Sequence, residues 1–223
     1  MSKPYRYEMH CHTSEVSGCA RVPAAESYRL HRDAGYHGIV VTDHFFTAAL
    51  DALAGPLWAD RVDAYLAGYR NMKRAAAPDF SVLLGLEFRF AGSVNDYLVF
   101  GVTPELLAAS TDLDRYDHAQ LRAFADAHDL LIVQAHPFRD GCTPDDPAFL
   151  DGVEVYNGNL WHQHNSLAQA YAERYGLIQT SGSDFHQPHM LARGGIRTDR
   201  PIRTERELVA LLRSGDYELV RAE

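Results

Sequence analysis

Two histidines near the amino terminus, His10 and His12, have the spacing of a metal-chelating pair. They lie in the stretch Tyr7-Glu8-Met9-His10-Cys11-His12-Thr13, which is typical of a strand. Side chains two residues apart on a strand point to the same face, so both imidazoles would aim at one point, as ligands of a metal ion do. Alone, the pair is explained equally well as chance in a chain with 12 histidines.

More residues of metal-ligand type stand at the ends of other apolar runs. Each of them alone has an ordinary structural explanation, such as a helix cap, a buried histidine or a turn acid. The regular placement of the whole set at predicted strand ends has none, and nitrogen and carboxylate ligands together suit a divalent ion. The complete set is His10, His12, His44, Glu87, Asp96, His136, Asp184 and His186.

The elements that must position these residues alternate along the chain. We predict strands at 5–11, 38–42, 80–86, 96–102, 130–134, 152–156, 177–180 and 217–220, and helices at 24–34, 57–77, 117–128, 163–175 and 204–214. Asp117 and Thr204 each precede a Gln or Glu by three residues, which indicates capping boxes. Alternating strands and helices predict an α/β fold with a parallel sheet, and a closed barrel of this kind gathers its catalytic groups at the carboxyl ends of the strands.

Length and composition favour one intracellular domain. The 223 residues are enough for a single domain spanning 1–223, and three scattered cysteines indicate reduced thiols. No apolar run approaches about 18 residues, so we expect a cytoplasmic protein without a membrane partner. The net charge of −9 argues against binding a nucleic acid polymer. No GxGxxG or P-loop motif is present, so we expect no nucleotide cofactor. Oligomeric state cannot be read from the sequence.

The set of motifs resembles the polymerase and histidinol phosphatase (PHP) family of metal-dependent phosphoesterases. The resemblance rests, in the order of the chain, on His10-Cys-His12-Thr13, Thr42-Asp43-His44, Gly85-Leu86-Glu87, Ala135-His136-Pro137 and Ser183-Asp184-Phe185-His186. It implies a distorted (β/α)7 barrel holding two or three divalent ions. By the same resemblance, a first ion takes His10, His12, Glu87 and Asp184, a second shares Glu87 with His136, and a third takes His44 and His186.

The sequence departs from the family pattern at two places. Asp96 stands where many members have a histidine, so we take it as a substitute ligand of the second ion. A carboxylate there favours Mn²⁺ or Fe²⁺ over Zn²⁺, but the full ligand set cannot choose among the three. Ser17-Gly18-Cys19 stands where many members have a third-ion ligand. Cys19 as a ligand is one alternative, and Cys19 as a small loop residue is the other.

Hydrolysis of a phosphate ester would account for both the metal-ligand residues and the nearby arginines. Paired ions neutralise phosphoryl oxygens and make a bridging hydroxide at neutral pH, which is the expected nucleophile. We take Asp184, Arg139 and His186 as the catalytic candidates. Arginine side chains match phosphate oxygens. The substrate-binding candidates are Arg139, Asn157, Arg193 and Arg197.

The sequence therefore predicts hydrolysis of a small phosphorylated metabolite. The candidates are a sugar or nucleotide phosphomonoester and a cyclic phosphodiester. One alternative is a metal-dependent amidohydrolase, but such an enzyme typically uses a strand-borne lysine, and Lys3 and Lys73 are at no predicted strand end. The other alternative is a non-catalytic PHP-like binding domain, which we expect to have lost ligands.

Overall fold

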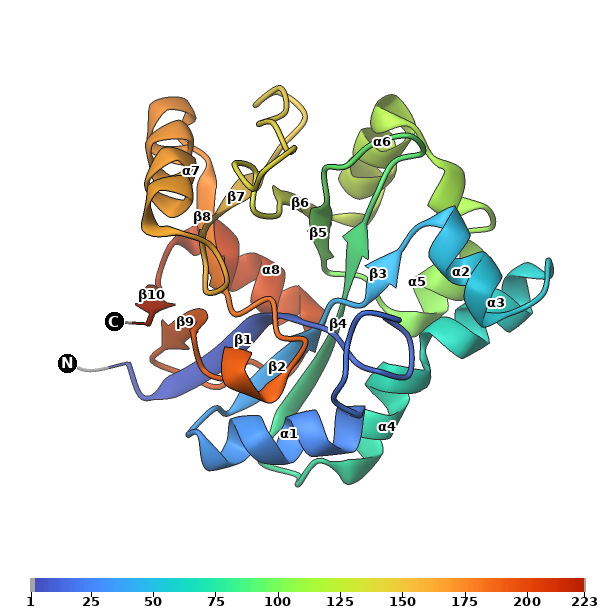
Figure 1. Cartoon of the computed structure of the whole chain (residues 1–223), viewed down its shortest axis with the longest axis horizontal. Coiled ribbons are helices and arrows are strands. Elements are labelled where there is room, and N and C mark those ends of the chain that lie inside the picture. The colour runs from blue at the N-terminus through green and yellow to red at the C-terminus, as the bar shows by residue number, and fades with distance from the viewer. Residues whose placement is uncertain (1–2, 223) are drawn as a thin grey trace.

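The computed structural model describes residues 3–222, which form a mixed sheet surrounded by helices (Figure 1). The strands are β1 (Tyr5–Cys11), β2 (Gly38–Val41), β3 (His44–Phe45), β4 (Ser81–Phe88), β5 (Tyr97–Phe100), β6 (Leu131–Gln134), β7 (Gly152–Asn157), β8 (Ile178–Gly182), β9 (Gly194–Thr198) and β10 (Glu218–Arg221). The α-helices are α1 (Ala24–Asp33), α2 (Thr47–Leu53), α3 (Trp58–Tyr65), α4 (Ala67–Ala75), α5 (Pro104–Ala109), α6 (His118–His128), α7 (His162–Tyr175) and α8 (Glu205–Ser214). Short 3₁₀ turns lie at Leu113–Arg115 and Pro188–Met190.

The sheet curls into a nearly closed barrel. Its strand order is β10-β9-β1-β2-β4-β5-β6-β7-β8, with β3 paired to β4. The barrel closes where the chain beyond β8, the last strand of this path, reaches β1. There the N–H of Phe185 donates to the carbonyl of His10, and the N–H of His12 donates to the carbonyl of Phe185, both at 3.0 Å. The predicted α/β barrel is confirmed in this nearly closed form.

Strand direction differs from the prediction of a parallel sheet. β5 runs antiparallel to both β4 and β6, and β9 runs antiparallel to β1 and β10. The sequence could not show strand direction, because a short apolar run has the same pattern in a parallel and in an antiparallel strand. The reversal places Asp96, which precedes β5, at the same edge of the sheet as residues that follow β4 and β6.

The predicted helix 57–77 is two helices, α3 and α4, separated at Leu66. A Cβ on Gly68 would lie 2.1 Å from the Thr13 hydroxyl oxygen and 2.9 Å from an Asp43 carboxylate oxygen, so only glycine lets α4 approach this closely. The capping boxes at Asp117 and Thr204 are both present. Residues 194–198, 47–53 and 104–109, which were not assigned to elements from the sequence, form β9, α2 and α5.

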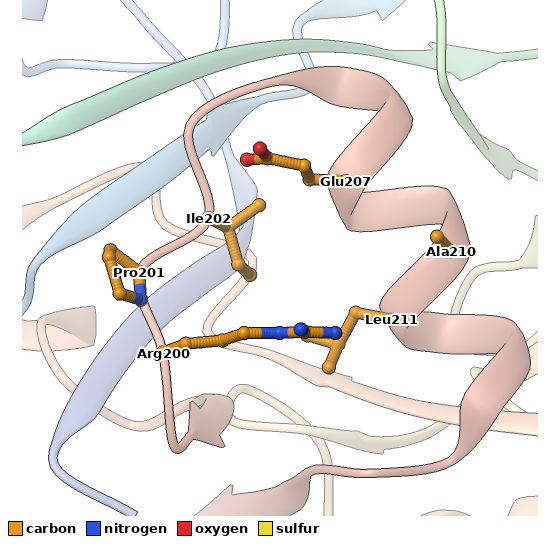
Figure 2. Close-up of a pocket in the computed structure, with 6 residues that line it drawn as sticks. All are labelled: Arg200, Pro201, Ile202, Glu207, Ala210 and Leu211. Carbon is orange, nitrogen blue, oxygen red and sulfur yellow. The ribbon is translucent and has the colours of Figure 1, made fainter.

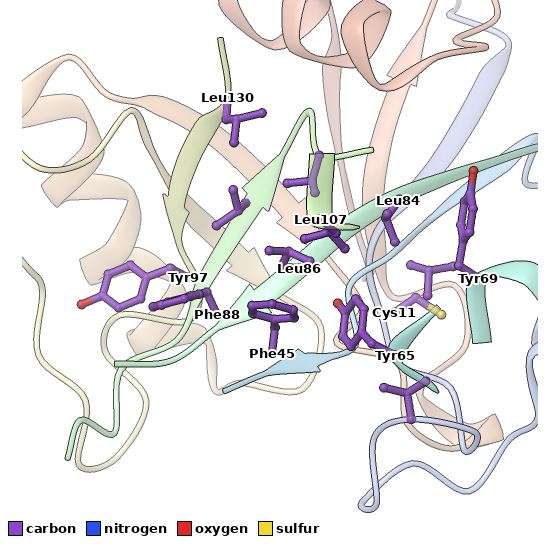
Figure 3. Close-up of a cluster of buried hydrophobic side chains, with 14 of the residues drawn as sticks. Cys11, Phe45, Tyr65, Tyr69, Leu84, Leu86, Phe88, Tyr97, Leu107 and Leu130 are labelled. Carbon is purple, nitrogen blue, oxygen red and sulfur yellow. The ribbon is translucent and has the colours of Figure 1, made fainter. Parts of the chain in front are cut away.

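A buried apolar cluster fills the space between the sheet and helices α3 to α6. Phe45, Tyr65, Leu86 and Phe88 are each at most 2% exposed and face one another in Figure 3. The rings of Phe45 and Tyr65 meet edge to face at 5.0 Å. This packing fixes the ends of β3 and β4, which carry His44 and Glu87.

Candidate metal centre

The structure brings all eight predicted ligand residues to one edge of the barrel. His10 and His12 end β1, His44 opens β3, Glu87 lies near the end of β4 and His136 follows β6. Asp184 and His186 follow β8, and Asp96 precedes β5. Five of the set are completely or almost completely buried, namely His10, His12, Glu87, Asp96 and His136.

Glu87 stands between four histidines, with two of them facing each carboxylate oxygen. Its Oε1 is 3.1 Å from His10 Nε2 and 3.2 Å from His136 Nε2. Its Oε2 is 3.4 Å from His12 Nε2 and 2.7 Å from His44 Nδ1. A carboxylate with ligand atoms gathered at both oxygens has the arrangement needed to bridge two ions.

Asp184 closes the group from the side that reaches solvent. Its Oδ1 lies 3.4 Å from the Nε2 atoms of both His10 and His12. The side chains of Asp184, His186 and His44 keep 14%, 16% and 18% of their surface exposed. These three residues therefore line the open mouth of the cluster.

Several buried atoms in the cluster have no hydrogen-bond partner among the described residues. They are His10 Nε2, His12 Nε2, His44 Nδ1 and Glu87 Oε2. Burying an unpaired polar atom is costly, yet these atoms lie close together without forming hydrogen bonds. They converge on common points, as ligands of an ion do. The groups whose ligand atoms all lie within 4.8 Å are His12, His44 and His186; His10, His136 and Asp184; His10, His12 and Glu87; and Glu87, Asp96 and His136.

Hydrogen-bond partners outside the cluster orient three of its histidines, namely His10, His186 and His12. His10 Nδ1 is 2.9 Å from Glu154 Oε1, and His186 Nδ1 is 2.9 Å from the carbonyl of Asp184. Both partners accept hydrogen bonds, so each Nδ1 carries a proton and each Nε2 is the atom left to bind an ion. Such partners fix the tautomer of a metal-binding histidine.

His12 is oriented through a relay. Ser17 Oγ donates to Asp43 Oδ1 at 2.7 Å and so has no second proton to give. At 3.0 Å it must accept from His12 Nδ1, which leaves His12 Nε2 free to bind an ion. Asp43 also accepts hydrogen bonds from the N–H and hydroxyl of Thr13, both at 2.7 Å.

The sequence reasoning missed Glu154, the partner of His10. Its other oxygen accepts from the N–H of His136 at 3.0 Å and from Asn157 Nδ2 at 2.9 Å. A Cβ on Gly182 would lie 2.7 Å from Glu154 Oε1, so glycine there makes room for the pair. The signal that could have found Glu154 is a glutamate inside a buried strand, since buried carboxylates need partners.

Burial and charge set the protonation of the cluster without ions. Burial lowers the pKa of His12 to about 3. Burial also lowers the pKa of His44, but the charge of Glu87 outweighs it and raises that pKa to about 10. Burial raises the pKa of Glu87, but the positive charges of His10 and His44 outweigh it and hold the pKa well below its usual range. Metal binding must displace the histidine protons.

Two residues of the cluster have backbones in the left-handed region. His136 has φ of 30° and Asp184 has φ of 50°. Residues other than glycine rarely adopt this backbone conformation, and those that do concentrate at functional sites. Directly after the strands end, the side chain of His136 faces Glu87 and that of Asp184 faces His10 and His12.

Asp96 is held by two arginines. Its carboxylate accepts from Arg89 Nε at 2.6 Å and Nη2 at 2.9 Å, and from Arg139 Nη2 at 3.1 Å. Asp96 Oδ2 is also 3.9 Å from His136 Nε2. Sequence reasoning missed Arg89 and the use of Asp96 as an anchor for guanidinium groups beside the ligands.

Two predicted substrate contacts, Arg139 and Asn157, lie against the cluster. Arg139 Nη1 is 3.4 Å from His136 Nε2. Asn157 is completely buried and its Nδ2 is 3.4 Å from Asp184 Oδ2, so it touches the cluster from behind. The other two lie further out. Arg193 is exposed, and its N–H donates to Ser183 Oγ beside Asp184.

Arg197 lies away from the cluster. It pairs with Arg6 of β1 across the β1–β9 ladder. Arg6 precedes His10 by four residues, which is about 13 Å along a strand. The structure therefore does not bring Arg197 together with the predicted ligands.

Cys19 lies at the mouth of the cluster. It is exposed, and its Sγ is 3.2 Å from His44 Nε2. Burial raises the pKa of the Cys19 thiol, but hydrogen bonds with His186 and His44 and their positive charges outweigh it and lower the pKa to about 6.

A surface pocket elsewhere on the molecule is separate from this centre. Figure 2 shows it between α8 and the preceding loop, lined by Arg200, Pro201, Ile202, Glu207, Ala210 and Leu211. Ile202 accepts a hydrogen bond from Ser81, the first residue of β4. Glu87 lies six residues further along that strand, about 20 Å away. The pocket is thus at the opposite end of the barrel.

The fold is similar to that of a protein described as containing a predicted PHP-like metal-dependent phosphoesterase. A family model described as PHP-associated matches residues 162–217. A search of curated proteins finds no significant match. The resemblance to the PHP family seen in the sequence is confirmed by this match and by the fold.

Three solved structures illustrate the likeness in fold. PsfC from Pseudomonas syringae PB-5123 is 20% identical with a TM-score of 0.68, over 92% of this chain and 88% of PsfC. A two-domain protein from Bacteroides vulgatus, containing a predicted PHP-like metal-dependent phosphoesterase, is 16% identical with a TM-score of 0.66, over 97% of this chain and 64% of that one. Endonuclease Q in complex with a 27-mer duplex is 15% identical with a TM-score of 0.62, over 94% of this chain and 56% of that one.

The endonuclease corrects one sequence-based expectation. We expected no nucleic acid polymer as a partner, but a protein of this fold binds duplex DNA with an abasic lesion at its active site. Net charge does not decide the matter, because metal ions and local arginines can neutralise phosphates at the site itself. As for membranes, none of the helices within residues 3–222 is long and apolar enough to cross a bilayer.

Proposed function

We propose that this chain is a metal-dependent phosphoesterase that hydrolyses a small phosphorylated metabolite and works as a single domain. The observation that carries the proposal is Glu87, whose two oxygens each face two histidines inside a buried cluster. A binding domain without catalysis has no need for such a costly arrangement of unpaired ligand atoms.

Two or three divalent ions fit the cluster. The first ion would be held by His10, His12, Glu87 and Asp184, and the second by Glu87 and His136, with Asp96 at its outer edge. The third would be held by His44 and His186. Nitrogen and oxygen ligands of this kind suit Mn²⁺, Fe²⁺ or Zn²⁺. When bound, the ions supply positive charge for phosphoryl oxygens and lower the pKa of a water molecule.

The protein's own groups bind the phosphate and move the proton. Arg139 and Arg89 share the Asp96 carboxylate, so one negative charge holds two positive groups beside the cluster, and their remaining N–H groups can donate to phosphate oxygens. Asp184, at the open mouth, is placed to orient a water and accept its proton. His186 Nε2, at the same mouth, is placed to bind an ion or, when protonated, to donate to a leaving group.

The amidohydrolase alternative gains no support from the lysines. Lys3 pairs with Asp199 and Asp216, and Lys73 donates to Tyr69, so both are committed away from the cluster. A sugar or nucleotide phosphomonoester or a cyclic phosphodiester remains the proposed substrate class.

A substrate panel tests the function. The full chain, loaded with Mn²⁺, is incubated with sugar phosphates, nucleotides, cyclic phosphates and an abasic DNA duplex, and product release is measured. We expect a small ester to be cleaved, and expect a chelator to stop the reaction. Stoichiometric metal binding with no ester cleaved would contradict the proposal, and cleavage of the duplex alone would replace the substrate class.

A further inference from the structure

Glu8 is a buried acid of β1 that has no part in the chemistry described so far. It is completely buried, two residues before His10. The register of β1 against β2 shifts at this place, because Glu8 pairs with Ile39 while Cys11 pairs with Val41. β1 therefore has one residue more than β2 over the same stretch, which makes a β-bulge. A bulge bends its strand and redirects side chains, and bulges are frequent beside active sites.

One oxygen of Glu8 accepts three backbone hydrogen bonds. The N–H groups of Met9 and His10, the two residues inside the bulge, donate to Oε1 at 2.9 Å and 3.0 Å. The N–H of Ser183 donates to the same oxygen at 2.8 Å. Ser183 follows β8 and directly precedes Asp184, in the segment through which the barrel closes onto β1. A single side chain thus holds the bulge and ties it to the opposite side of the closure.

The other oxygen of Glu8 faces a buried histidine of α1. Oε2 lies 3.7 Å from His31 Nε2, and neither atom has a hydrogen-bond partner within residues 3–222. His31 Nδ1 donates to the carbonyl of Ser27 at 2.8 Å, and the rings of Tyr36 and Phe185 pack edge-on against His31. An apolar side chain would fill this space without leaving a buried oxygen unpaired, so packing alone does not account for Glu8.

The backbone groups that Glu8 binds carry two ligand residues of the first ion. His10 is one of these ligand residues, and Ser183 is the neighbour of the other, Asp184. His10 Nε2 and Asp184 Oδ1 approach to 3.4 Å from the two sides of the closure. The hydrogen bonds of Glu8 therefore set the distance between the two backbones from which these side chains reach the ion.

We propose that Glu8 is a positioning residue of the metal centre. It acts through the N–H groups of His10 and Ser183, and so fixes His10 and Asp184 relative to each other. The property that matters is an oxygen acceptor at this distance from the backbone of β1. The inference rests on the metal cluster of the proposed function and assigns a role to a residue that is not itself a ligand.

Two uncharged variants of similar length test the role of the oxygen. Glu8→Gln keeps an oxygen for the three N–H groups, and its NH₂ group faces His31 Nε2, which can accept because Nδ1 donates to Ser27. Glu8→Met has a similar length but offers only a weakly accepting sulfur. Mn²⁺ affinity is measured by chelator competition on the full chain. We expect near-normal affinity in Glu8→Gln, and a loss of about tenfold or more for the tightest ion in Glu8→Met.

A matched control separates positioning from stability. Ser81→Ala removes a buried hydrogen bond to the carbonyl of Ile202, at the opposite end of the barrel. Its melting temperature should fall while its Mn²⁺ affinity stays normal. Normal affinity in Glu8→Met, or equal loss in Glu8→Gln and Glu8→Met, would overturn the inference. If Glu8→Met does not fold, Glu8→Asp replaces it. The shorter acid keeps the charge but falls short of the N–H of Ser183, so it should also weaken binding, and normal affinity would be contrary evidence.

These affinities are read without substrate, which keeps this inference distinct from the proposed function. A chain that binds Mn²⁺ and cleaves no ester loses the proposed function, while the difference between Glu8→Gln and Glu8→Met still establishes the role of Glu8. A chain that cleaves esters and binds Mn²⁺ equally well in both variants does the reverse. A wild type that binds no Mn²⁺ at all would refute both.

Discussion

Glu154→Gln tests whether the partners behind the cluster control metal affinity. Glu154 is completely buried and accepts three hydrogen bonds, from His10 Nδ1, the N–H of His136 and Asn157 Nδ2. Glutamine has almost the same shape, but one of its two terminal atoms is a donor. In either orientation of the amide, one arm of this network is broken.

The consequence differs with the orientation of the amide. If its oxygen stays on His10, the NH₂ group faces two other donors, the N–H of His136 and Asn157 Nδ2. If it turns, the NH₂ group donates to His10 Nδ1, and the proton of His10 must then move to Nε2, the atom meant for the ion. A hydrogen bond to a charged group contributes about 1.5–3 kcal/mol, and each 1.4 kcal/mol is tenfold in affinity. We therefore expect metal binding to weaken on the order of 10- to 100-fold, as for other such partners.

A chelator-competition titration of Mn²⁺ measures the effect. The matched control is Asp114→Asn, which also neutralises a buried carboxylate but sits 3.5 Å from Arg61, in the 3₁₀ turn between α5 and α6. The control should lose stability and keep its metal affinity. Unchanged affinity in Glu154→Gln, or equal weakening in both variants, would show that the reasoning about tautomers is wrong.

Three further predictions follow from the same geometry. Asp184→Asn should lower turnover by about 100-fold or more, because the amide cannot accept the proton of a water. Its circular dichroism should stay unchanged, because asparagine tolerates the left-handed backbone at this position. Near-normal turnover would exclude Asp184 as the proton acceptor. Arg139→Ala should mainly raise KM for phosphate esters, whereas the exposed Arg70→Ala should not, and an unchanged KM would show that Arg139 does not bind substrate. Removing the ions with a chelator should lower the melting temperature by about 10 °C for each tightly bound ion, since each contributes about 4 kcal/mol at saturating metal. Equal melting curves with and without metal would mean that no resident ion stabilises the fold.

The sequence alone determined which residue types form the centre and that they gather at one end of the barrel. A histidine pair on a strand, and acids or histidines after buried apolar runs, carry their signal locally, because strand periodicity fixes which side chains share a face. The capping boxes at Asp117 and Thr204 were predictable for the same reason, since both depend on residues three positions apart.

Tertiary structure alone decided which residues stand behind the ligands. Glu154 meets His10 across 144 positions in the chain, and Arg89 meets Asp96 only because β5 runs antiparallel to β4. Neither strand direction nor a contact between distant strands leaves a pattern in a short apolar run. The sequence could therefore show that Cys19 stands in the loop after His12, but only the folding of that loop onto His44 and His186 places its sulfur at the mouth of the cluster.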